Sequence, residues 1–403
     1  MKYIMKNNIK GVLIIIIIVA FPFFSNAQQE PGEEIVSQVI QSIDNQYYDT
    51  AYNGKNWEKI QLETVLLMEM LPLKNTQFVD SLLYRLDDPS VRVLTPTQFQ
   101  TLNTELTKSQ HIGIGLTELL CVDIDKKTRE VKIITPLHNS PAARANLQPN
   151  DIILSINKQS VEGLQLEEVM DLMRLKKGKK VKLKIKRNDK IRKVKIKTAV
   201  VQQSLEPYFK VIIHNDKKIG CVWFPQFTNA AAPQFQDIIQ QFQAQNVDGI
   251  LLDLRNNPGG LLQEVQRIGG FCMGQTAMGR AEGKSNYLSV LPTLEAKITD
   301  LPMVVLTNNG TASAAELLAG SLQYEKRATI IGERTNGKGL IHTFIPLADD
   351  YIMACSIGRI SLLSGRDLLT EGVEPDIIIK NDKPFSFGQI DDDQQFLKGL
   401  EQF

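Results

Sequence analysis

The stretch "LPMVVLTNNGTASAAELLAGSLQ", Leu301 to Gln323, contains the pattern on which the expected fold depends. A short apolar run, typical of a buried strand, is followed by small and apolar residues at helical spacing. The same order recurs where "KIGCVWFPQF" precedes "AAAPQFQDIIQQFQAQ" and where "VDGILLDLR" precedes "GGLLQEVQRIGGFC", and a last strand-like run, "ATIIGE", follows. This alternation indicates an α/β core with a largely parallel sheet, whose ligands gather where strands end and helices begin.

The chain before this core contains two regions with different sequence patterns. Residues 28–104 contain three segments with apolar residues at helical spacing, so we expect a small helical region there. Residues 105–198 contain short strand-like runs, a small helix in "SPAARANLQPND" and an amphipathic helix in "LQLEEVMDLMRLKKG". The expected fold class is therefore α/β and multi-domain: an N-terminal helical region, a β-rich domain with two helices, and an α/β core at 199–403.

The end of the β-rich domain is strongly basic. The run "KKVKLKIKRNDKIRKVKIK" alternates Lys with Val, Leu or Ile, and residues 174–197 include many basic residues but only one acidic residue, Asp189. One interpretation is a basic patch for an acidic partner or surface. We favour the other, a hairpin whose solvent face is lysine and whose charge protects an edge strand from aggregation, because the alternation explains the pattern unaided.

The first 27 residues have the features of a signal peptide. Lysines precede an apolar run from Gly11 to Phe24, and the small residues Ser25 and Ala27 are placed for cleavage before Gln28. The apolar run is shorter than the roughly 20 residues that a bilayer span needs. We therefore expect a cleaved signal peptide at 1–27 and an exported mature chain, most simply a periplasmic one; an uncleaved anchor or release from the cell is the alternative.

The composition is that of an ordinary globular protein. The chain has 403 residues, 43% of them hydrophobic, and a formal net charge of +1, which by itself predicts neither nucleic acid nor membrane as a partner. Neither the histidines nor the cysteines have the spacing of a metal site, so no metal or cofactor is expected. The apolar surroundings of the cysteines favour buried thiols over a disulfide, although one bridge is left open: Cys121, Cys221, Cys272 and Cys355.

Ser313 stands at the start of the expected helix and has two interpretations. With Glu316 it forms the Ser-x-x-Glu pattern of a capping box, which alone would favour a helix cap. The small residues around it also leave room for a substrate carbonyl. Backbone N–H groups at a helix N-terminus, such as that of Ala314, can stabilise an oxyanion. Ser313 is therefore also a candidate nucleophile.

Two other segments favour the nucleophile. "LDLRNNPGGLL" places Gly259 and Gly260 between a strand and a helix, where a backbone N–H can serve an oxyanion. "GERTNGKGLIHTFIPL" places Lys338 between two glycines, and a neutral lysine is the base in Ser-Lys enzymes. The plainer alternatives are a strand-to-helix turn and a surface lysine. A histidine-based triad is less attractive because only His342 falls near these elements.

Together these motifs resemble the C-terminal processing (tail-specific) serine peptidases. "NNGTASAAELLAGSLQ" followed by "IIGERTNGKG" is similar to the signature of that family, "LLDLRNNPGGLL" to its glycine loop, and "SLLSGRDLLTEGVEPDIII" to its closing segment. "DNQYYDTAYNGKNW" and "LDDPSVRVLTPTQF" resemble the helical region of its cyanobacterial and chloroplast members. The resemblance covers nearly the whole mature chain, with the motifs in the order of the family.

The resemblance implies the roles of the candidate residues. Ser313 would be the nucleophile and Lys338 the general base, and the N–H of Ala314 would form the oxyanion hole with the glycine loop, most simply through Gly260 rather than Gly259. The β-rich domain would be a PDZ domain, with "IGIGL" as its carboxylate-binding loop and first binding strand. The peptide-binding residues would be Ile112, Gly113, Ile114, Gly115 and Leu116, whose apolar members suit a nonpolar tail.

One position departs from the family. Where its members usually have a Gln that orients the lysine, this chain has His342. A neutral imidazole can accept a hydrogen bond from the lysine, whereas a protonated one cannot and adds a like charge beside the base. We hypothesise that His342 orients Lys338 and makes activity more acid-sensitive than a Gln would. A weakened or inactive enzyme is left open.

The predicted function is that of an exported serine endopeptidase that binds protein C-termini through its PDZ domain. It would cleave near the tail by a Ser-Lys dyad, through an acyl-enzyme. The expected partners are protein substrates with nonpolar tails and, as an open point, an activating or adaptor protein. No nucleic acid is expected, and the membrane enters only through an uncleaved signal segment. The alternatives are a non-catalytic PDZ adaptor with a decayed peptidase core and a hydrolase of short peptides.

Overall fold

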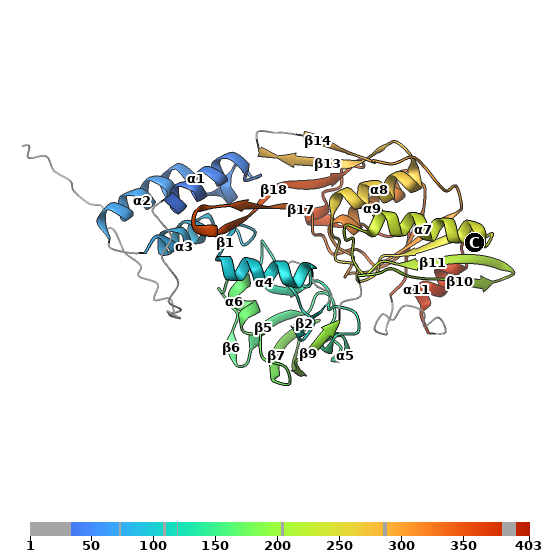
Figure 1. The fold of residues 1–403 in the computed structure, drawn as a ribbon, viewed down its shortest axis with the longest axis horizontal. Coiled ribbons are helices and arrows are strands. Elements are labelled where there is room, and N and C mark those ends of the chain that lie inside the picture. Colours follow the sequence, from blue (N-terminus) through green and yellow to red (C-terminus); the bar gives the residue numbers. More distant parts are fainter. Residues whose placement is uncertain are drawn as a thin grey trace, which may run out of the picture. The chain divides into compact units, whose positions relative to one another are not determined.

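The computed structural model describes residues 34–71, 74–107, 110–118, 120–202, 205–284, 288–380 and 392–403 (Figure 1). The expected signal peptide lies outside these residues. Within the described part of the chain, no helix combines the length and the apolar character needed to cross a membrane.

The N-terminal region is helical, as expected. It contains α1 (Glu34–Gln46), the short 3-10 turn Tyr52–Gly54, α2 (Trp57–Met70), α3 (Asn75–Leu86) and α4 (Pro96–Thr107). On α1 the buried residues recur three or four positions apart, which places them on one face: Ile35, Val36, Val39 and Ile43. That face packs in one hydrophobic cluster with Met353 and Cys355, which come from the far end of the chain. The helical region is therefore built onto the C-terminal half rather than standing alone.

An antiparallel sheet provides that contact. Its long central strand, β18 (Ile352–Leu362), pairs with β1 (Arg92–Leu94), β13 (Ala277–Gly283) and β17 (Leu340–Pro346), and β14 (Leu288–Pro292) pairs with β13. The strand β1 thus joins the helical region to the peptidase half, and β17 begins directly after the segment that carries Lys338. The alternation of strands and helices in the sequence did not predict this sheet.

The α/β core is a six-stranded sheet in the order β10-β11-β12-β15-β16-β19. These strands are Tyr208–His214, Lys217–Trp223, Gly249–Asp253, Met303–Thr307, Thr329–Gly332 and Ile377–Ile378. All neighbours from β11 to β19 are parallel, and only β10 is antiparallel to its neighbour, so the expected parallel core is confirmed.

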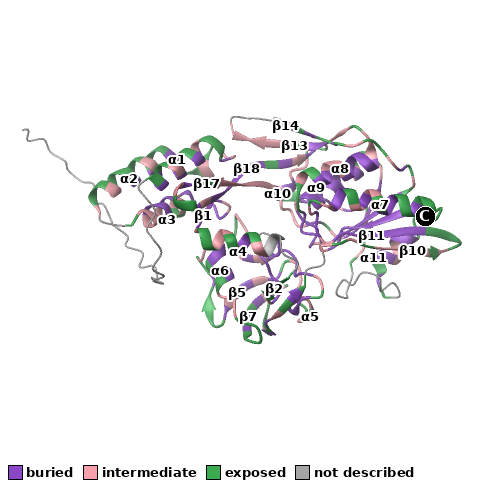
Figure 2. Ribbon diagram, viewed as in Figure 1, coloured by how far each residue is buried: buried purple, intermediate pink, exposed green. Residues whose placement is uncertain are grey.

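Helices cover both faces of this sheet (Figure 2). One face packs against α7 (Ala231–Ala244), α8 (Leu262–Met273) and α9 (Ala314–Tyr324), and the other against α11 (Gln394–Leu400). Successive residues of β12 alternate between the two cores, with Ile250 and Leu252 on one side and Leu251 on the other. This alternation explains why the parallel strands read as continuous apolar runs. The carboxyl ends of β12 and β15 lead into the loops that hold the candidate active-site residues.

The β-rich domain has the expected strands and two helices. Its main sheet has the order β3-β4-β5-β7-β8, with the short β6 on β5. These strands are Val122–Ile124, Val131–Ile133, Ile152–Ile156, Lys180–Arg187, Lys190–Lys197 and, for β6, Gln159–Ser160. The helices are α5 (Pro141–Arg144), capped by the Ser140 hydroxyl, and α6 (Leu166–Asp171).

The structure also has a separate two-stranded sheet. It pairs β2 (Gln110–Gly113) with β9 (Ala199–Gln202), and Val201 of β9 is buried in the domain core. Residues 199–202, which the sequence pattern placed at the start of the peptidase core, thus pair with the first strand of the β-rich domain.

All four cysteines are free and buried, as the sequence predicted. Burial raises the pKa of the thiols of Cys221, Cys272 and Cys355 to about 12. At neutral pH these thiols are protonated and act as small apolar core groups.

Candidate active site

Ser313 is the residue immediately before α9, and its backbone is in an unusual conformation. Its φ is 57° and its ψ is −125°, whereas an ordinary N-cap residue lies in the β region. A non-glycine residue with such angles costs roughly 1–3 kcal/mol, which the surrounding structure must offset. The side chain is not fully buried. A helix cap alone does not require this strain, whereas a nucleophile presented on a tight turn before a helix does.

Glu316 connects Ser313 to the segment that carries Lys338. Its fully buried carboxylate accepts hydrogen bonds from the N–H of Ser313 at 2.8 Å, of Gly337 at 2.8 Å and of Lys338 at 2.9 Å. The Thr335 hydroxyl also donates to it. Burial raises the pKa of the Glu316 carboxyl, even though these hydrogen bonds favour its charged form. The sequence showed Glu316 only as half of a capping box, and its second set of partners comes from the tertiary structure.

The glycine loop lies directly against the serine turn. A Cβ atom on Gly259 would lie 2.8 Å from both the Ala312 carbonyl oxygen and Ser313 Cβ, and 2.9 Å from Ala314 N. Gly259 also has a φ of 98° and Gly260 a φ of 140°, which favour glycine at both positions. No side chain fits between Gly259 and the turn at Ser313.

The N–H groups of the two glycines differ in availability. That of Gly259 donates to the Asn257 side chain at 2.8 Å, so it is already committed within the loop. Between the described residues, the N–H groups of Gly260 and Ala314 have no hydrogen-bond acceptor. Of the three oxyanion candidates, Gly260 and Ala314 are therefore the two whose donors are available in this arrangement.

Asparagine side chains hold the two loops together. The Asn308 carboxamide accepts from the N–H of Asn256 at 2.9 Å and donates to its side-chain oxygen at 2.9 Å. The Asn257 carbonyl accepts from the N–H of Ala312 at 2.9 Å, and the fully buried Asn257 side chain donates to the Phe224 carbonyl. These contacts fix the glycine loop relative to Ser313.

A buried arginine, Arg255, lies where the glycine loop leaves β12 and forms ion pairs there. The Arg255 guanidinium is fully buried and binds both oxygens of Asp253, at 2.9 and 2.7 Å. It also donates to Asp393 at 2.8 Å, at the start of α11. The arginine thereby joins the end of β12 to the C-terminal helix. No local pattern in the sequence pairs Arg255 with Asp393.

Lys338 forms an ion pair with a residue of the β-rich domain. Its Nζ lies 3.0 Å from Oδ2 of Asp123, on β3, and the lysine side chain is only 11% exposed. Burial acts to raise the pKa of the Asp123 carboxyl, but the charge of Lys338 and a hydrogen bond from the Ile124 N–H hold that pKa below its usual range. The carboxylate is therefore charged and engages the lysine amine in an ion pair. A general base must instead be neutral.

His342 lies on β17 opposite Ser356 of β18, close enough to Lys338 to respond to its charge. The Nδ1 atom of His342 is 3.1 Å from the Ser356 hydroxyl. Desolvation lowers the pKa of His342 to about 4, and the positive charge of Lys338 contributes to this shift. At neutral pH the imidazole is therefore uncharged, which is the state in which it can accept a hydrogen bond.

The structure separates the side chains of the expected peptide-binding stretch. Ile112 is 53% exposed, whereas Ile114 and Leu116 are 2% and 5% exposed and belong to the domain core. Ile114 and Leu116 thus fill the core beneath the loop, and of these three apolar side chains Ile112 is the one exposed at the surface. Gly113 ends β2, and Gly115, with a φ of 85°, lies so close to Ser140 that a Cβ atom would clash.

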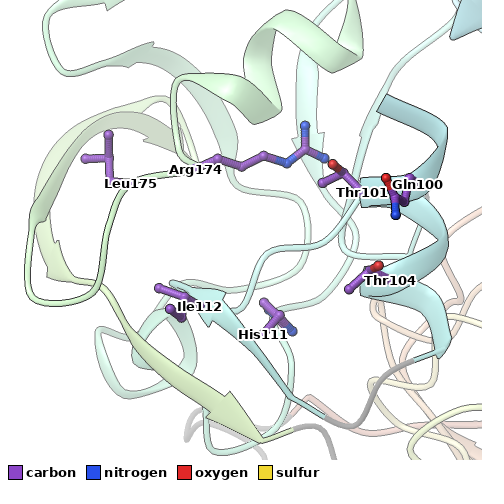
Figure 3. Close-up of a pocket in the computed structure, with 7 residues that line it drawn as sticks. All are labelled: Gln100, Thr101, Thr104, His111, Ile112, Arg174 and Leu175. Carbon is purple, nitrogen blue, oxygen red and sulfur yellow. The ribbon is translucent and has the colours of Figure 1, made fainter. Parts of the chain in front are cut away.

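A pocket of about 360 Å³ lies beside Ile112 (Figure 3). Figure 3 shows Gln100, Thr101 and Thr104 on one wall, projecting from α4. The remaining lining residues come from β2 and from the segment after α6: His111, Ile112, Arg174 and Leu175. The helical region thus supplies one wall of a pocket whose other walls belong to the β-rich domain. Sequence reasoning did not single out this wall.

Comparison with known proteins agrees with this architecture. The family model of the PDZ domain matches residues 112–198, and that of peptidase family S41 matches residues 218–379. A carboxyl-terminal-processing protease of Picosynechococcus sp. is 30% identical over 398 residues, covering 97% of this chain and 94% of that protein. Another, of Synechocystis sp., is 31% identical over 372 residues, covering 89% of this chain and 83% of that protein.

A solved structure is also similar. The structure of a photosystem II D1 C-terminal processing protease matches with a TM-score of 0.78 and 26% identity, over 92% of this chain and 96% of that one. The fold and the motifs define a serine peptidase core with a PDZ domain. This chain belongs to the carboxyl-terminal-processing proteases of peptidase family S41. The resemblance inferred from the motifs is confirmed, and so is the assignment of the chain as a serine endopeptidase.

Proposed function

We propose that the chain is an exported endopeptidase that cleaves proteins near nonpolar C-termini with a Ser313–Lys338 dyad. The observation that carries the proposal is the strained backbone of Ser313, held against the glycine loop and connected through Glu316 to Lys338. This arrangement combines a presented hydroxyl, a lysine whose backbone is bound to the same carboxylate as that of Ser313, and two available N–H donors, which are the parts that acyl transfer needs.

The chemical steps follow from these groups. The Ser313 hydroxyl oxygen would attack the scissile carbonyl carbon while neutral Lys338 takes the hydroxyl proton. The N–H groups of Gly260 and Ala314 would stabilise the resulting oxyanion. Lys338 would then protonate the leaving amine, which leaves the substrate acyl group on Ser313. A water molecule, deprotonated by Lys338, would release the acid and restore the serine hydroxyl.

Tail recognition is the part of the proposal that involves the PDZ domain. A PDZ groove binds an extended C-terminus by strand addition, and backbone N–H groups capture its carboxylate. The exposed Ile112 on β2, beside the pocket, supports a nonpolar preference for the residue that lies there. The curated relatives are described as carboxyl-terminal-processing proteases, which agrees with this substrate class.

The ion pair between Lys338 and Asp123 adds a condition to the mechanism. While the carboxylate of Asp123 lies 3.0 Å from the lysine Nζ, it engages the amine in an ion pair, and an amine held in that way cannot accept the serine proton. The described arrangement is therefore a resting one in this proposal. Productive binding of a tail would have to separate Asp123 from Lys338. His342, uncharged beside the lysine, would then orient the neutral amine.

The test presents an unfolded protein with a nonpolar C-terminus to the wild type, Ser313→Ala and Lys338→Ala, with cleavage followed by mass spectrometry. We expect cleavage only by the wild type, with fragments that map near the tail. Equal cleavage by all three proteins would rule out the dyad. Tail binding without cleavage by the wild type would favour a non-catalytic adaptor, and cleavage that is independent of the tail sequence would favour a short-peptide hydrolase.

A further inference from the structure

The hairpin β7–β8 has a solvent face made almost entirely of lysine. In its register Lys180 lies opposite Lys197, Lys182 opposite Lys195 and Lys184 opposite Lys193. The next pair on this face is Lys186 and Ile191. The alternate residues of β7, Val181, Leu183 and Ile185, are buried in the core of the domain. We call these eight positions, seven lysines and one isoleucine, the lysine face.

The arrangement is electrostatically unfavourable in the isolated protein. Like charges directly opposite one another on antiparallel strands destabilise the sheet, and here three such pairs follow in succession. Among the residues that the structure describes, the one carboxylate paired with this face is that of Glu130, which lies 2.7 Å from Lys186 Nζ. The six lysines of the opposed pairs therefore have no ion-pair partner on the described chain.

Protection of an edge strand explains only half of this pattern. The strand β8 is the last of its sheet, where lysines discourage pairing with another chain. The strand β7 is an interior strand that pairs with β5 on one side and with β8 on the other. It has no free edge to protect, and yet Lys180, Lys182 and Lys184 are all exposed on it. Edge protection, the explanation that we favoured from the sequence, therefore does not account for the lysines of β7.

We propose that the lysine face binds the anionic surface of a lipid bilayer. A sheet face presents its ammonium groups side by side, which suits a flat partner whose charges can rearrange laterally. All the basic residues of the face are lysines, which act as mobile point charges, whereas recognition of individual phosphates or carboxylates favours the bidentate arginine. A polybasic surface of this kind is attracted to anionic lipid headgroups.

Ile191 supports a bilayer over a soluble acidic partner. It is 58% exposed, lies on the same face as the lysines and stands near the turn of the hairpin. An exposed apolar side chain beside a row of cations can enter the boundary between headgroups and acyl chains. The proposal gives the mature chain a membrane contact of its own, independent of any signal segment and of the active site.

The experiment measures co-sedimentation with lipid vesicles. The chain from Gln28 onward is mixed with vesicles of phosphatidylcholine alone, or of equal parts phosphatidylcholine and phosphatidylglycerol. The test variant replaces Lys182, Lys184 and Lys193 with Gln. The matched control replaces three lysines that lie outside the face, Lys59, Lys218 and Lys326, with Gln. Both variants lose the same formal charge.

We expect the wild type and the control to bind the anionic vesicles, less strongly at high salt, and to leave the neutral ones unbound. The test variant should bind about 100-fold more weakly, because each lysine near the surface contributes about one kcal/mol. Ile191→Ser should weaken binding by a smaller factor. The unfolding midpoint of the test variant should not fall, since the substitutions relieve repulsion between opposed lysines.

Three outcomes would overturn the proposal. The first is a wild type that does not bind anionic vesicles. The second is equal loss of binding in the test and control variants, which would mean that net charge alone is responsible. The third is binding of the wild type to polyglutamate, abolished in the test variant, without binding to vesicles. That result would identify an acidic polypeptide as the partner of this face.

Discussion

Ser313 and Lys338, the proposed nucleophile and base, are held in different ways. Ser313, the glycine loop and their asparagine contacts all belong to the α/β core, so the oxyanion side of the site is assembled within one domain. The backbone of Lys338 is tied to the same core through Glu316, but its side chain is paired with Asp123 of the PDZ domain. In the proposed mechanism the half of the site around Ser313 is therefore fixed within the core, whereas the side chain of Lys338 depends on the PDZ domain through its contact with Asp123.

The largest effect should come from removing the reacting groups themselves. Ser313→Ala and Lys338→Ala should each lower kcat by at least about 10⁴-fold, because residues that act as a unit lose nearly all catalysis when either is removed. The measurement is the rate of tail cleavage. Ser364→Ala, at an exposed position, is the control and should leave the rate unchanged. Substantial residual activity in Lys338→Ala would mean that another group serves as the base.

The second-largest effect should come from the glycine loop that lies against Ser313. Gly259→Ala should lower kcat about 10²- to 10³-fold, the cost typical of a lost oxyanion donor, because its Cβ would push the loop away from Ser313. The control is Gly365→Ala, which has a φ of 86° but no neighbouring atom within 4 Å, so it shares the backbone strain without the clash. If both variants lose activity equally, backbone strain and not contact with Ser313 is the cause.

Breaking the ion pair between Lys338 and Asp123 should raise activity rather than lower it. Asp123→Asn should raise the rate on a short peptide, which does not engage the PDZ domain, by about 5-fold, because it removes a partly exposed ion pair worth about one kcal/mol. The control is Asp125→Asn, whose carboxylate pairs with Lys132 instead. An unchanged or lower rate in Asp123→Asn would contradict the resting role of this ion pair.

A further effect, on stability rather than on rate, should be the pH dependence that His342 confers. Its pKa in the folded state is about 4, below the ordinary value of 6.5, so the unfolded chain binds more protons between these two values. Stability should therefore be constant above pH 6.5 and fall as the pH decreases toward 4, by up to about 3 kcal/mol. Urea unfolding of His342→Gln should show a smaller decrease, while His214→Gln, on β10, should behave as the wild type.

The same substitution tests the orienting role of His342. Because the imidazole is neutral above about pH 5, the pH–rate profiles of the wild type and His342→Gln should agree near neutrality and separate on the acid side. Acid limbs that coincide would show that His342 does not make activity acid-sensitive.

Much of the fold was accessible from the sequence because its signals are local. The apolar runs of β12 and β15 and the helices that follow them were predicted where the structure has them, since a buried parallel strand followed by an amphipathic helix has a distinct pattern. The antiparallel sheet around β18 was missed, because it joins segments that are distant in the chain. For the same reason the pairing of β9 with β2 was not predicted, since these strands lie about 90 residues apart in the chain.

The sequence by itself determined the family, the position of Ser313 before a helix, and the segments that carry Gly259, Gly260 and Lys338. These are properties of short motifs, whose turn chemistry and apolar periodicity are read within a few residues. The tertiary structure decided which N–H groups are available, that Glu316 joins Ser313 to the segment of Lys338, and that Asp123 holds the lysine side chain. It also showed that half of the lysine-rich hairpin is an interior strand. Such contacts depend on which distant segments meet, and burial then sets the charge of the groups that they bring together.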